Sequence, residues 1–313
     1  MRKGKWIQGA TPGDPVSVAA RKALRARLRA VDFYLPLAAF KSSRDVEYVH
    51  QLRVASRRAL AAVRTFAPLL AARQSKWLSK QLKRIRRTAG AARNLDVLGR
   101  RIAEELPSEG GESRAALIAK IESCRDDAQP ALRKIYVKMR RRGYAEKSRQ
   151  IAKRARWREK GPEPSFAGAA TACLQSVAEP FFAAAMADTE HTQALHDFRI
   201  KAKHLRYSLE IFAAALDPDF RSTLYPAVEE IQTRLGEVND QAAAIEQCQA
   251  WLASWDDPQL REALREIEMR DQQEMKAASE RFAHWWSLER AADLRRRFDQ
   301  ALAASAAPGE RSA

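Results

Sequence analysis

The sequence predicts an all-α protein. Helix-breaking residues are sparse, with only 12 Gly and 13 Pro in 313 residues. Apolar residues recur at spacings of three and four, as in Leu78, Leu82, Ile85 and Ala89, which is the pattern of one face of a helix. No stretch of useful length alternates apolar and polar residues as a half-buried strand does. These observations together predict a fold built from helices alone.

Clusters of Gly, Pro, Ser and Asp divide the chain into roughly ten or more expected helices. We expect residues 1–14 and 305–313 to be terminal tails, because such ends are often poorly ordered. The expected breaks, in chain order, are residues 41–45, the region of Pro68, residues 106–113, the region of Gly143, and residues 160–165, 217–219 and 256–258.

A repeat with a constant offset of 146 residues runs through the chain. It aligns "HQLRVASRR" (50–58) with "HDFRIKAKH" (196–204), and it also pairs Phe66 with Phe212 and Gly90 with Gly236. One register without a net insertion covers about 65 residues. The repeat predicts two similar helical halves, about 15–160 and 161–304, and such duplicates commonly pack about a pseudo-twofold axis.

Basic residues form stripes on three of the expected helices. At 100° per residue, the bases of each stripe share one side of the helix, and apolar residues occupy the other side. The first stripe is His50, Arg53, Arg57 and Arg64, the second is His196, Arg199, Lys203 and Arg206, and the third is Lys76, Lys80, Lys83 and Arg87.

The charge balance around the first and third stripes favours an anionic partner. Residues 51–95 hold twelve Lys and Arg but no Asp or Glu, whereas the equivalent residues 197–241 hold six bases and eight acids. A solvated helix face usually mixes signs, because like charges one turn apart cost a few tenths of a kcal/mol. With a net charge of +17, the chain is expected to attract polyanions over a long range.

A further basic segment, residues 133–160, holds thirteen Lys and Arg against Glu146 and Glu159. Two interpretations stay open for it. The segment could extend the anion-binding surface, or it could be a solvated helical connector.

No catalytic, metal-binding or cofactor-binding pattern is found. His50 and His196 stand without a carboxylate or Cys at ligand spacing, so each is expected to donate a hydrogen bond to an anion or to stand at a helix start. The chain also has no Gly-rich phosphate loop and no Ser/His/Asp arrangement. We therefore expect a binding protein that has no metal site and needs no cofactor.

From the sequence, we expect the protein to be cytoplasmic. No charge-free stretch approaches the ~20 apolar residues that span a bilayer, and the basic start is not followed by the apolar segment of a signal peptide. Cys124, Cys173 and Cys248 are scattered singly, which fits small buried side chains in a reducing compartment.

Four segments resemble the CHAD family, named for its conserved histidine α-helical domain. "VHQLRVASRRALAAVRTF" (49–66) and "LHDFRIKAKHLRYSLEIF" (195–212) are similar to the two signature helices of that family. "LKRIRRTAGAARNLDVL" (82–98) and "VEEIQTRLGEVNDQAA" (228–243) resemble the segments that follow them. The likeness spans roughly residues 15–303. Nothing in the chain could form the β-barrel of the triphosphate-tunnel enzymes that often accompany this family, so a stand-alone domain is expected.

The resemblance implies two helical bundles around a basic central pore or groove that binds inorganic polyphosphate. Three positions depart from the family pattern: Leu60 and His204 stand where a base is usual, and Asn94 replaces an Asp. These departures put single contacts in doubt without removing the stripes. Matching residue by residue, the resemblance implies binding roles for His50, Arg53, Arg57, Arg58, Arg64 and Arg93, and for His196, Arg199, Lys203, Arg206 and Tyr207.

The basic stripes and the CHAD resemblance together predict non-catalytic binding of inorganic polyphosphate, with attachment to polyphosphate granules as one role. The alternative is a nucleic-acid-binding helical protein, which the net charge would serve equally well. Single-strand binders usually place aromatic platforms among their bases, and the stripes here offer only Tyr207 and Trp77. The preferred chain length and the oligomeric state do not follow from the sequence.

Overall fold

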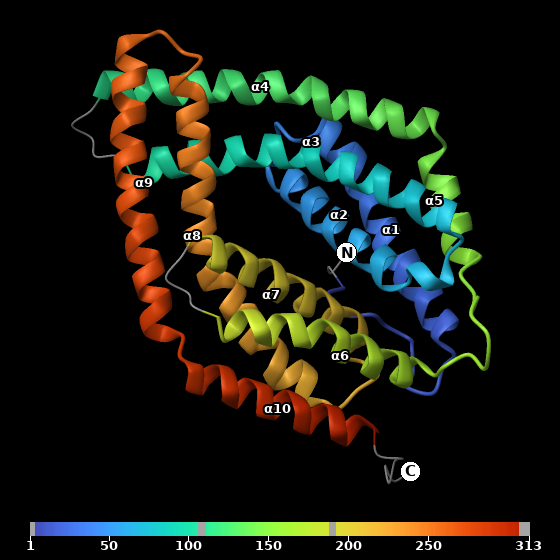
Figure 1. The fold of residues 1–313 in the computed structure, drawn as a ribbon. Coiled ribbons are helices and arrows are strands. Elements are labelled where there is room, and N and C mark those ends of the chain that lie inside the picture. Colours follow the sequence, from blue (N-terminus) through green and yellow to red (C-terminus); the bar gives the residue numbers. More distant parts are fainter. Residues whose placement is uncertain (1–3, 106–110, 188–191, 307–313) are drawn as a thin grey trace.

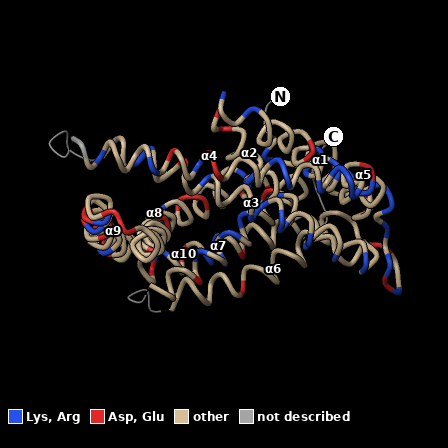
Figure 2. Tube along the Cα trace, turned by 90° about the horizontal axis from the view of Figure 1, so that it is seen from above, with Lys and Arg blue, Asp and Glu red and all other residues tan. Residues whose placement is uncertain are grey.

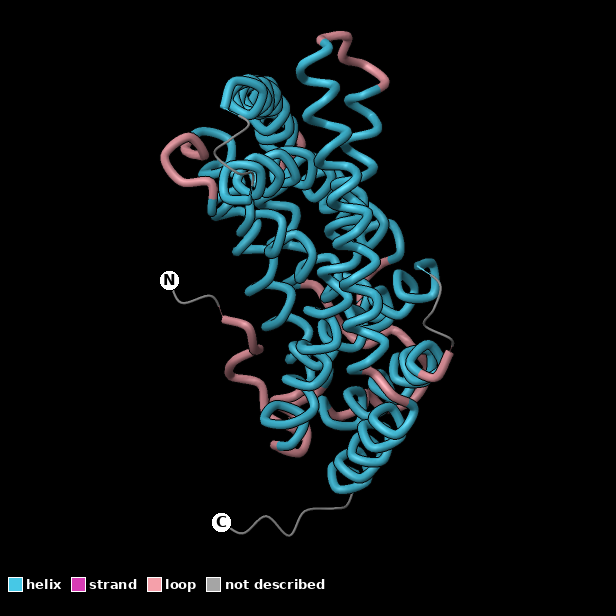
Figure 3. Tube along the Cα trace, turned by 90° about the vertical axis from the view of Figure 1, so that its left-hand side faces the viewer, coloured by secondary structure: helices cyan, strands magenta, loops and turns pink. Residues whose placement is uncertain are grey.

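The computed structural model describes residues 4–105, 111–187 and 192–306 and consists of α-helices joined by short connections (Figure 1). Within those ranges the one β-type pairing is an isolated bridge between Pro15 and Ser165, and Figure 3 draws no strand. The prediction of an all-α protein is confirmed. The helices up to residue 153 are α1 (Val16–Phe40), α2 (Glu47–Thr65), the 3-10 turn η1 (Ala67–Leu69), α3 (Ala72–Glu105), α4 (Gly111–Arg141) and α5 (Tyr144–Lys153).

The second part of the chain continues with five more α-helices. None of the helices in the described ranges is both long and apolar enough to cross a membrane. These helices are α6 (Phe166–Ala185), α7 (Thr192–Phe212), the π-helical turn η3 (Phe220–Leu224), α8 (Tyr225–Leu252), α9 (Pro258–Trp285) and α10 (Leu288–Ala306).

Most of the predicted helix breaks coincide with observed connections. Connections lie before α2, around Pro68, at Gly143, before α6, after α7 and before α9. The predicted break at 106–113 falls largely outside the described residues, and α4 begins at its end. The predicted C-terminal tail likewise lies almost wholly outside them.

Local sequence signals explain where several helices begin and end. The Ser165 hydroxyl accepts a hydrogen bond from the Gly168 amide (3.1 Å) and caps α6. The Asp257 carboxylate accepts bonds from two amides of the first turn of α9, as polar N-cap side chains do. Gly143 has a φ of 62° and separates α4 from α5, because glycine enters the left-handed region without steric cost.

The main hydrophobic core lies between helices of both parts of the chain. It contains buried side chains of α1, α2 and α3 together with those of α6, α7 and α8. A smaller core joins the C-terminal end of α3 and the N-terminal end of α4 to the α8–α9 pair, with Ile102, Leu117 and Leu264 fully buried. Figure 1 shows α8 and α9 as a long pair that reaches the ends of α3 and α4. The α8–α9 pair therefore packs against the ends of α3 and α4 and supports the N-terminal part of the fold there.

Residues 4–14, in the predicted N-terminal tail, form no helix but pack against the helices. Ile7 is part of the main core, and the Trp6 ring meets the Tyr225 ring edge-on. The buried Arg27 guanidinium donates to the carbonyl oxygens of Gly4 (2.8 Å) and Lys5 (2.6 Å). This segment is thus held across α1 and α8.

A buried carboxylate, Glu210, connects four helices. Its side chain is 1% exposed and accepts two hydrogen bonds from Arg58, at 2.7 and 2.9 Å. Arg27 on α1 lies 3.6 Å away, and the Tyr225 hydroxyl on α8 donates to it (3.2 Å). Because both arginines would otherwise be buried without a counter-charge, Glu210 holds α1, α2, α7 and α8 together.

We predict that Glu210→Gln destabilises the protein strongly, because the amide keeps the shape but leaves Arg27 and Arg58 buried without an anion. The free energy of unfolding, measured by urea titration, should fall by about 3–5 kcal/mol. The matched control is Glu179→Gln, which removes the same charge from an exposed pair with Arg295 and should change stability far less. Equal effects of the two substitutions would contradict the role given to Glu210.

Candidate anion-binding groove

A groove of about 510 Å³ opens between α2 and α7, with α3 on one side and α6 on the other. Figure 2 shows Lys and Arg gathered along α3 and α7 near the middle of the molecule, whereas α6 carries none. One wall is therefore basic and the other is apolar. The lining residues are Arg57, Leu60, Ala61, Arg64, Thr65 and Pro68 of the α2 region, Arg86 of α3, Cys173 and Val177 of α6, and Ile200, Lys203, His204, Tyr207 and Ser208 of α7.

The first two predicted stripes meet at this groove. Arg57 and Arg64 reach it from α2, and Lys203 and Tyr207 reach it from α7. Arg53 lies one turn along α2, where it donates to the Asn94 side chain (3.0 Å) and to the Gly90 carbonyl oxygen (3.4 Å) of α3. The 3.6-residue period placed these bases on one face, and packing of α2 against α7 brings the two faces together.

Arg199 extends the basic surface on α7. It pairs with Asp240 of α8 (3.5 Å), whose own side chain is 73% exposed. Asp240 does not belong to the groove lining, which holds no acid within the described ranges. The Nε atoms of Arg57 and Arg199 are buried and have no hydrogen-bond partner there. Positive charge at the groove is thus largely uncompensated.

Burial and neighbouring positive charges lower the pKa values of several arginines at the groove. Burial is the largest cause in each case, and it lowers the pKa of Arg53, Arg86 and Arg199. Arg57 contributes further to all three shifts, since a neighbouring positive charge disfavours the protonated form. An anion bound here would relieve both the desolvation and the mutual repulsion.

The largest lowering of a pKa among the groove cations is that of Lys203. Burial, followed by repulsion from Arg199 and Arg57, lowers its pKa to about 7; Asp240 opposes the shift and Arg53 adds to it. This lysine is therefore only about half protonated near neutral pH in the free protein.

Two basic residues of the groove were not among the predicted site residues. The third predicted stripe includes Arg87 but not Arg86, and it is Arg86 that lines the groove. Arg86 lies one turn before Gly90, whose carbonyl oxygen accepts a hydrogen bond from Arg53. Gly90 is paired with Gly236 in the repeat, so this pairing was the sequence signal that could have identified the groove side of α3. His204, noted only as a departure from the family pattern, lies with its Nε2 atom 3.4 Å from Arg64 Nη1.

Two predicted site residues are engaged elsewhere. Arg58 is bound to Glu210, as described above, and Arg206 pairs with Glu229 (3.0 Å) and contacts the Tyr225 hydroxyl (3.2 Å). Both arginines belong to a polar network around Glu210, Tyr225 and Glu229 that lies outside the groove lining. Their acidic partners lie far away in sequence or on another helix, so the stripe pattern alone could not reveal the pairing.

The remaining predicted residues do not line the groove. His196 is exposed, and its Nδ1 atom lies 3.0 Å from the Asn239 side-chain oxygen. His50 and Arg93 are half-buried, and Arg93 lies near Asp96 and Glu47. The third stripe, Lys76, Lys80, Lys83 and Arg87, is exposed along α3.

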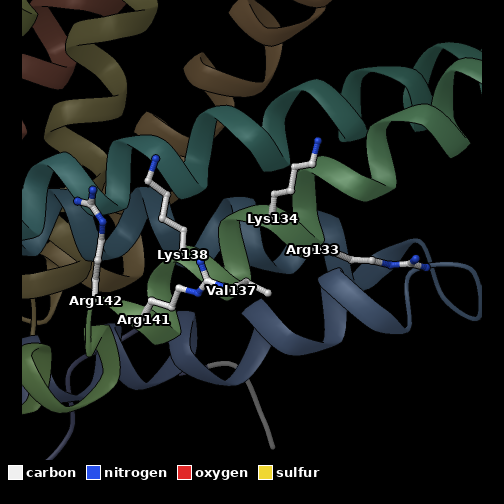
Figure 4. Close-up of a pocket in the computed structure, with 6 residues that line it drawn as sticks. All are labelled: Arg133, Lys134, Val137, Lys138, Arg141 and Arg142. Atoms are coloured by element: carbon white, nitrogen blue, oxygen red, sulfur yellow. The ribbon is translucent and has the colours of Figure 1, made fainter.

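The basic segment 133–160 forms a separate surface on α4 and α5. A shallow hollow of about 550 Å³ follows one face of α4, and Figure 4 shows Lys138 and Arg142 directed to the α3 side of that helix. Arg142 donates to Gln81 of α3 (3.4 Å). None of these residues lines the α2–α7 groove, so both interpretations of the segment stay open. The hollow is lined by Arg133, Lys134, Val137, Lys138, Arg141 and Arg142.

No group of three His, Cys, Asp or Glu side chains in the described ranges could hold a metal ion. The groove itself offers guanidinium and ammonium groups on one side and aliphatic carbon on the other. This arrangement is chemically suited to an anion, which guanidinium and ammonium groups hold through charge and directed hydrogen bonds.

Comparisons with known proteins agree with this architecture. A family model described as the CHAD domain matches residues 22–249. The structure is similar to the crystal structure of the CHAD domain from the plant Ricinus communis, with a TM-score of 0.69 and 20% identity over 97% of this chain and 96% of that chain. It is also similar to PptA from Streptomyces chartreusis, with a TM-score of 0.62 and 19% identity over 87% of this chain and 99% of that chain. At these identities the structural matches show a shared fold. No functionally curated protein matches the chain.

We predict a pH dependence of anion binding that originates at Lys203. A bound polyanion stabilises the protonated amine, so binding takes up a proton, and affinity should fall as the pH rises from 7 to 9. Losing the whole contact charge should cost about 1 kcal/mol, or roughly fivefold in affinity. Because Lys203 is already about half neutral at pH 7, the fall from pH 7 to 9 should be about threefold. Histidines are ordinarily neutral across this range. The measurement is calorimetric titration with long-chain polyphosphate at constant ionic strength.

Lys203→Arg should flatten this response, because a guanidinium stays charged throughout the range. Lys134→Arg, on the separate α4 surface, is the matched control and should leave the response as in the unmodified protein. An unchanged slope in Lys203→Arg would assign the pH dependence to another group.

Proposed function

The chain belongs to the CHAD domain family, and from this premise we propose that it binds inorganic polyphosphate in the α2–α7 groove without chemically altering it. The observation that carries the proposal is the convergence of bases from three helices on one groove whose described lining holds no acid, with Asp240 paired to Arg199 beside it. That arrangement raises the free energy of the unliganded protein and is relieved by an anion.

A linear phosphate polymer suits this surface chemically. Each phosphoryl unit carries about one negative charge, so cations spaced along facing helices can follow a chain of identical anions. Arginine supplies forked hydrogen bonds, and lysine supplies a compact charge that tolerates sliding. Release of condensed counterions would drive much of the binding, as it does for nucleic acids.

We further propose that the chain is a duplication whose halves, about 15–160 and 161–304, pack about a pseudo-twofold axis. Two contacts between α2 and α7 support this. Arg58 contacts Glu210, and Arg64 contacts His204; the offset of 146 turns 58 into 204 and 64 into 210. A contact between i and j′ that recurs between j and i′ is the mark of an isologous, twofold interface.

Helix bounds and a core contact support the same proposal. Adding 146 to the bounds of α2 gives 193–211, close to α7 (Thr192–Phe212), and adding it to the bounds of α4 gives 257–287, close to α9 (Pro258–Trp285). The paired residues Phe66 and Phe212 also meet, with ring centroids 5.9 Å apart. A residue touches its own repeat equivalent only near the axis that relates the halves.

Two features favour polyphosphate over single-stranded nucleic acid. Tyr207, the aromatic residue of the described groove lining, is 8% exposed, so it offers little face for a stacked base. Trp77 lies outside the groove and stacks on Tyr144. The lining also holds no carboxylate, which favours binding over acid–base chemistry. The proposed setting is the cytoplasm, where the domain would attach to polyphosphate granules.

Replacing Arg53, Arg57 and Arg64 together by Gln should weaken polyphosphate binding by about 100-fold, taking about 1 kcal/mol for each lost charge contact. The linear plot of log affinity against log salt should also become shallower by roughly two to three units. Both quantities come from titrations across a salt series, with circular dichroism to verify that the helices remain.

The matched control removes three exposed bases from α9 and α10: Arg265, Arg296 and Arg297, each replaced by Gln. It changes the net charge equally but lies away from the groove, so it should lower affinity only modestly. Equal losses in the two triple variants would mean that overall charge, and not the groove, attracts the polymer.

Affinity should rise with polymer length, from orthophosphate and pyrophosphate to long polyphosphate, because each added contact becomes intramolecular once the chain is held. Calorimetry on length-fractionated polyphosphates measures this, and phosphate release is assayed in parallel with and without magnesium. Competition with single-stranded DNA of matched charge tests the alternative partner. Length-independent affinity, steady phosphate release, or preference for the DNA would each refute the proposed function.

A further inference from the structure

The α2–α7 groove has an apolar wall that an inorganic polymer cannot use. Val177 and Cys173 of α6 face the bases across the groove, and Ile200 of α7 stands beside them. Ile200 is 39% exposed, which leaves an aliphatic side chain partly open to water directly next to Lys203 and His204. Phosphate oxygens placed against this wall would lose hydration without gaining a hydrogen bond.

The opposite wall is built for an anion. Arg57, Arg64 and Arg86 line it, and the Nε atom of Arg57 is buried without a partner in the described ranges. No acidic side chain belongs to the described lining. A ligand that satisfies both walls must therefore join an anionic group to a flat or aliphatic group that can leave water.

Polar groups in the groove lining narrow the class of ligand further. The lining also includes Thr65 and Ser208, which carry hydroxyls, and His204, whose ring lies 3.4 Å from the Arg64 guanidinium. A heteroaromatic ring, which has apolar faces and hydrogen-bonding edges, fits this mixture better than an alkyl chain. The volume of about 510 Å³ is within the range of pockets that enclose small organic ligands, about 300–1,000 Å³.

We propose that this part of the groove binds a nucleoside polyphosphate. Its phosphates lie on Arg57, Arg64 and Arg86, and its base lies against Val177 and Ile200. The inference rests on the proposed function only in that both ligands use the same bases, so nucleotide and polyphosphate compete for the groove. The protein would then release or take up polyphosphate in response to nucleotide concentration.

The test compares ATP with tripolyphosphate, which offers at least as much charge on the same number of phosphates but no base. Calorimetric titrations at one pH and salt concentration, without magnesium, should show ATP binding about fivefold tighter or more, as expected when part of the surface of one base is buried against an aliphatic wall. Binding of tripolyphosphate as tight as that of ATP, or tighter, would overturn the proposal.

Ile200→Ser distinguishes the contribution of the apolar wall from that of the bases, since it removes the partly exposed aliphatic group and leaves every base in place. It should abolish the advantage of ATP while changing the affinity for tripolyphosphate less than twofold. Leu288→Ser, at a 63% exposed position of α10, is the matched control and should preserve that advantage. An equal loss for both ligands in Ile200→Ser would overturn the proposal, and Arg64→Gln should weaken both.

Long-chain polyphosphate is titrated on the same samples to keep the two proposals distinct. If polyphosphate binds and ATP shows no advantage, the nucleotide site is refuted and the proposed function stands. If ATP binds with its advantage and polyphosphate does not bind, the proposed function is refuted and the nucleotide site stands. Failure of both ligands to bind refutes both.

Discussion

The buried carboxylate of Glu210 is the contact on which the arrangement of the groove depends. It holds Arg58 by two hydrogen bonds and lies beside Arg27, which fixes the rotation of α2 about its own axis. With Arg58 directed to that network, the neighbouring Arg57, about 100° further round the helix, faces the groove with Arg64. A buried pair of this kind contributes little net stability compared with apolar packing, but breaking it is costly, so it secures one orientation of the helix.

Stability and function act in opposite directions at this junction. The groove cations repel one another and are partly desolvated, which lowers the pKa of Lys203 to about 7. The free protein tolerates this because the surrounding helices are held by the main core and by the smaller core of the α8–α9 pair. In the proposed function, a bound anion would offset this repulsion, so the groove would be a locally destabilised region of a well-supported fold.

The sequence predicted the helices well because their signals are local. Gly143, the Ser165 cap and the Asp257 cap act within a turn of their own positions, and the 3.6-residue period places Arg53 and Arg57 on one face without knowledge of the partner helix. The fate of Arg58 could not be predicted, because its partner lies 152 residues away and both faces of α2 carry bases. The apolar wall was equally hidden: Val177 on α6 resembles any core residue until packing places it opposite Arg57.

The proposed duplication also accounts for the uneven charge of the two halves: the first half supplies Arg57, Arg64 and Arg86 at the groove, whereas the second supplies Lys203 together with most of the acids. At the offset of 146, Arg64 corresponds to Glu210, Lys83 to Glu229 and Arg86 to Gln232. Glu210 and Glu229 hold Arg58 and Arg206, so the acids of the second half act as internal counter-charges. Had both halves kept the bases, the junction would bury many like charges with no anion to balance them. Divergence of the copies therefore allows a cationic groove to lie beside a stable twofold junction. It also makes the groove asymmetric, because α8 carries no basic stripe that corresponds to the bases of α3.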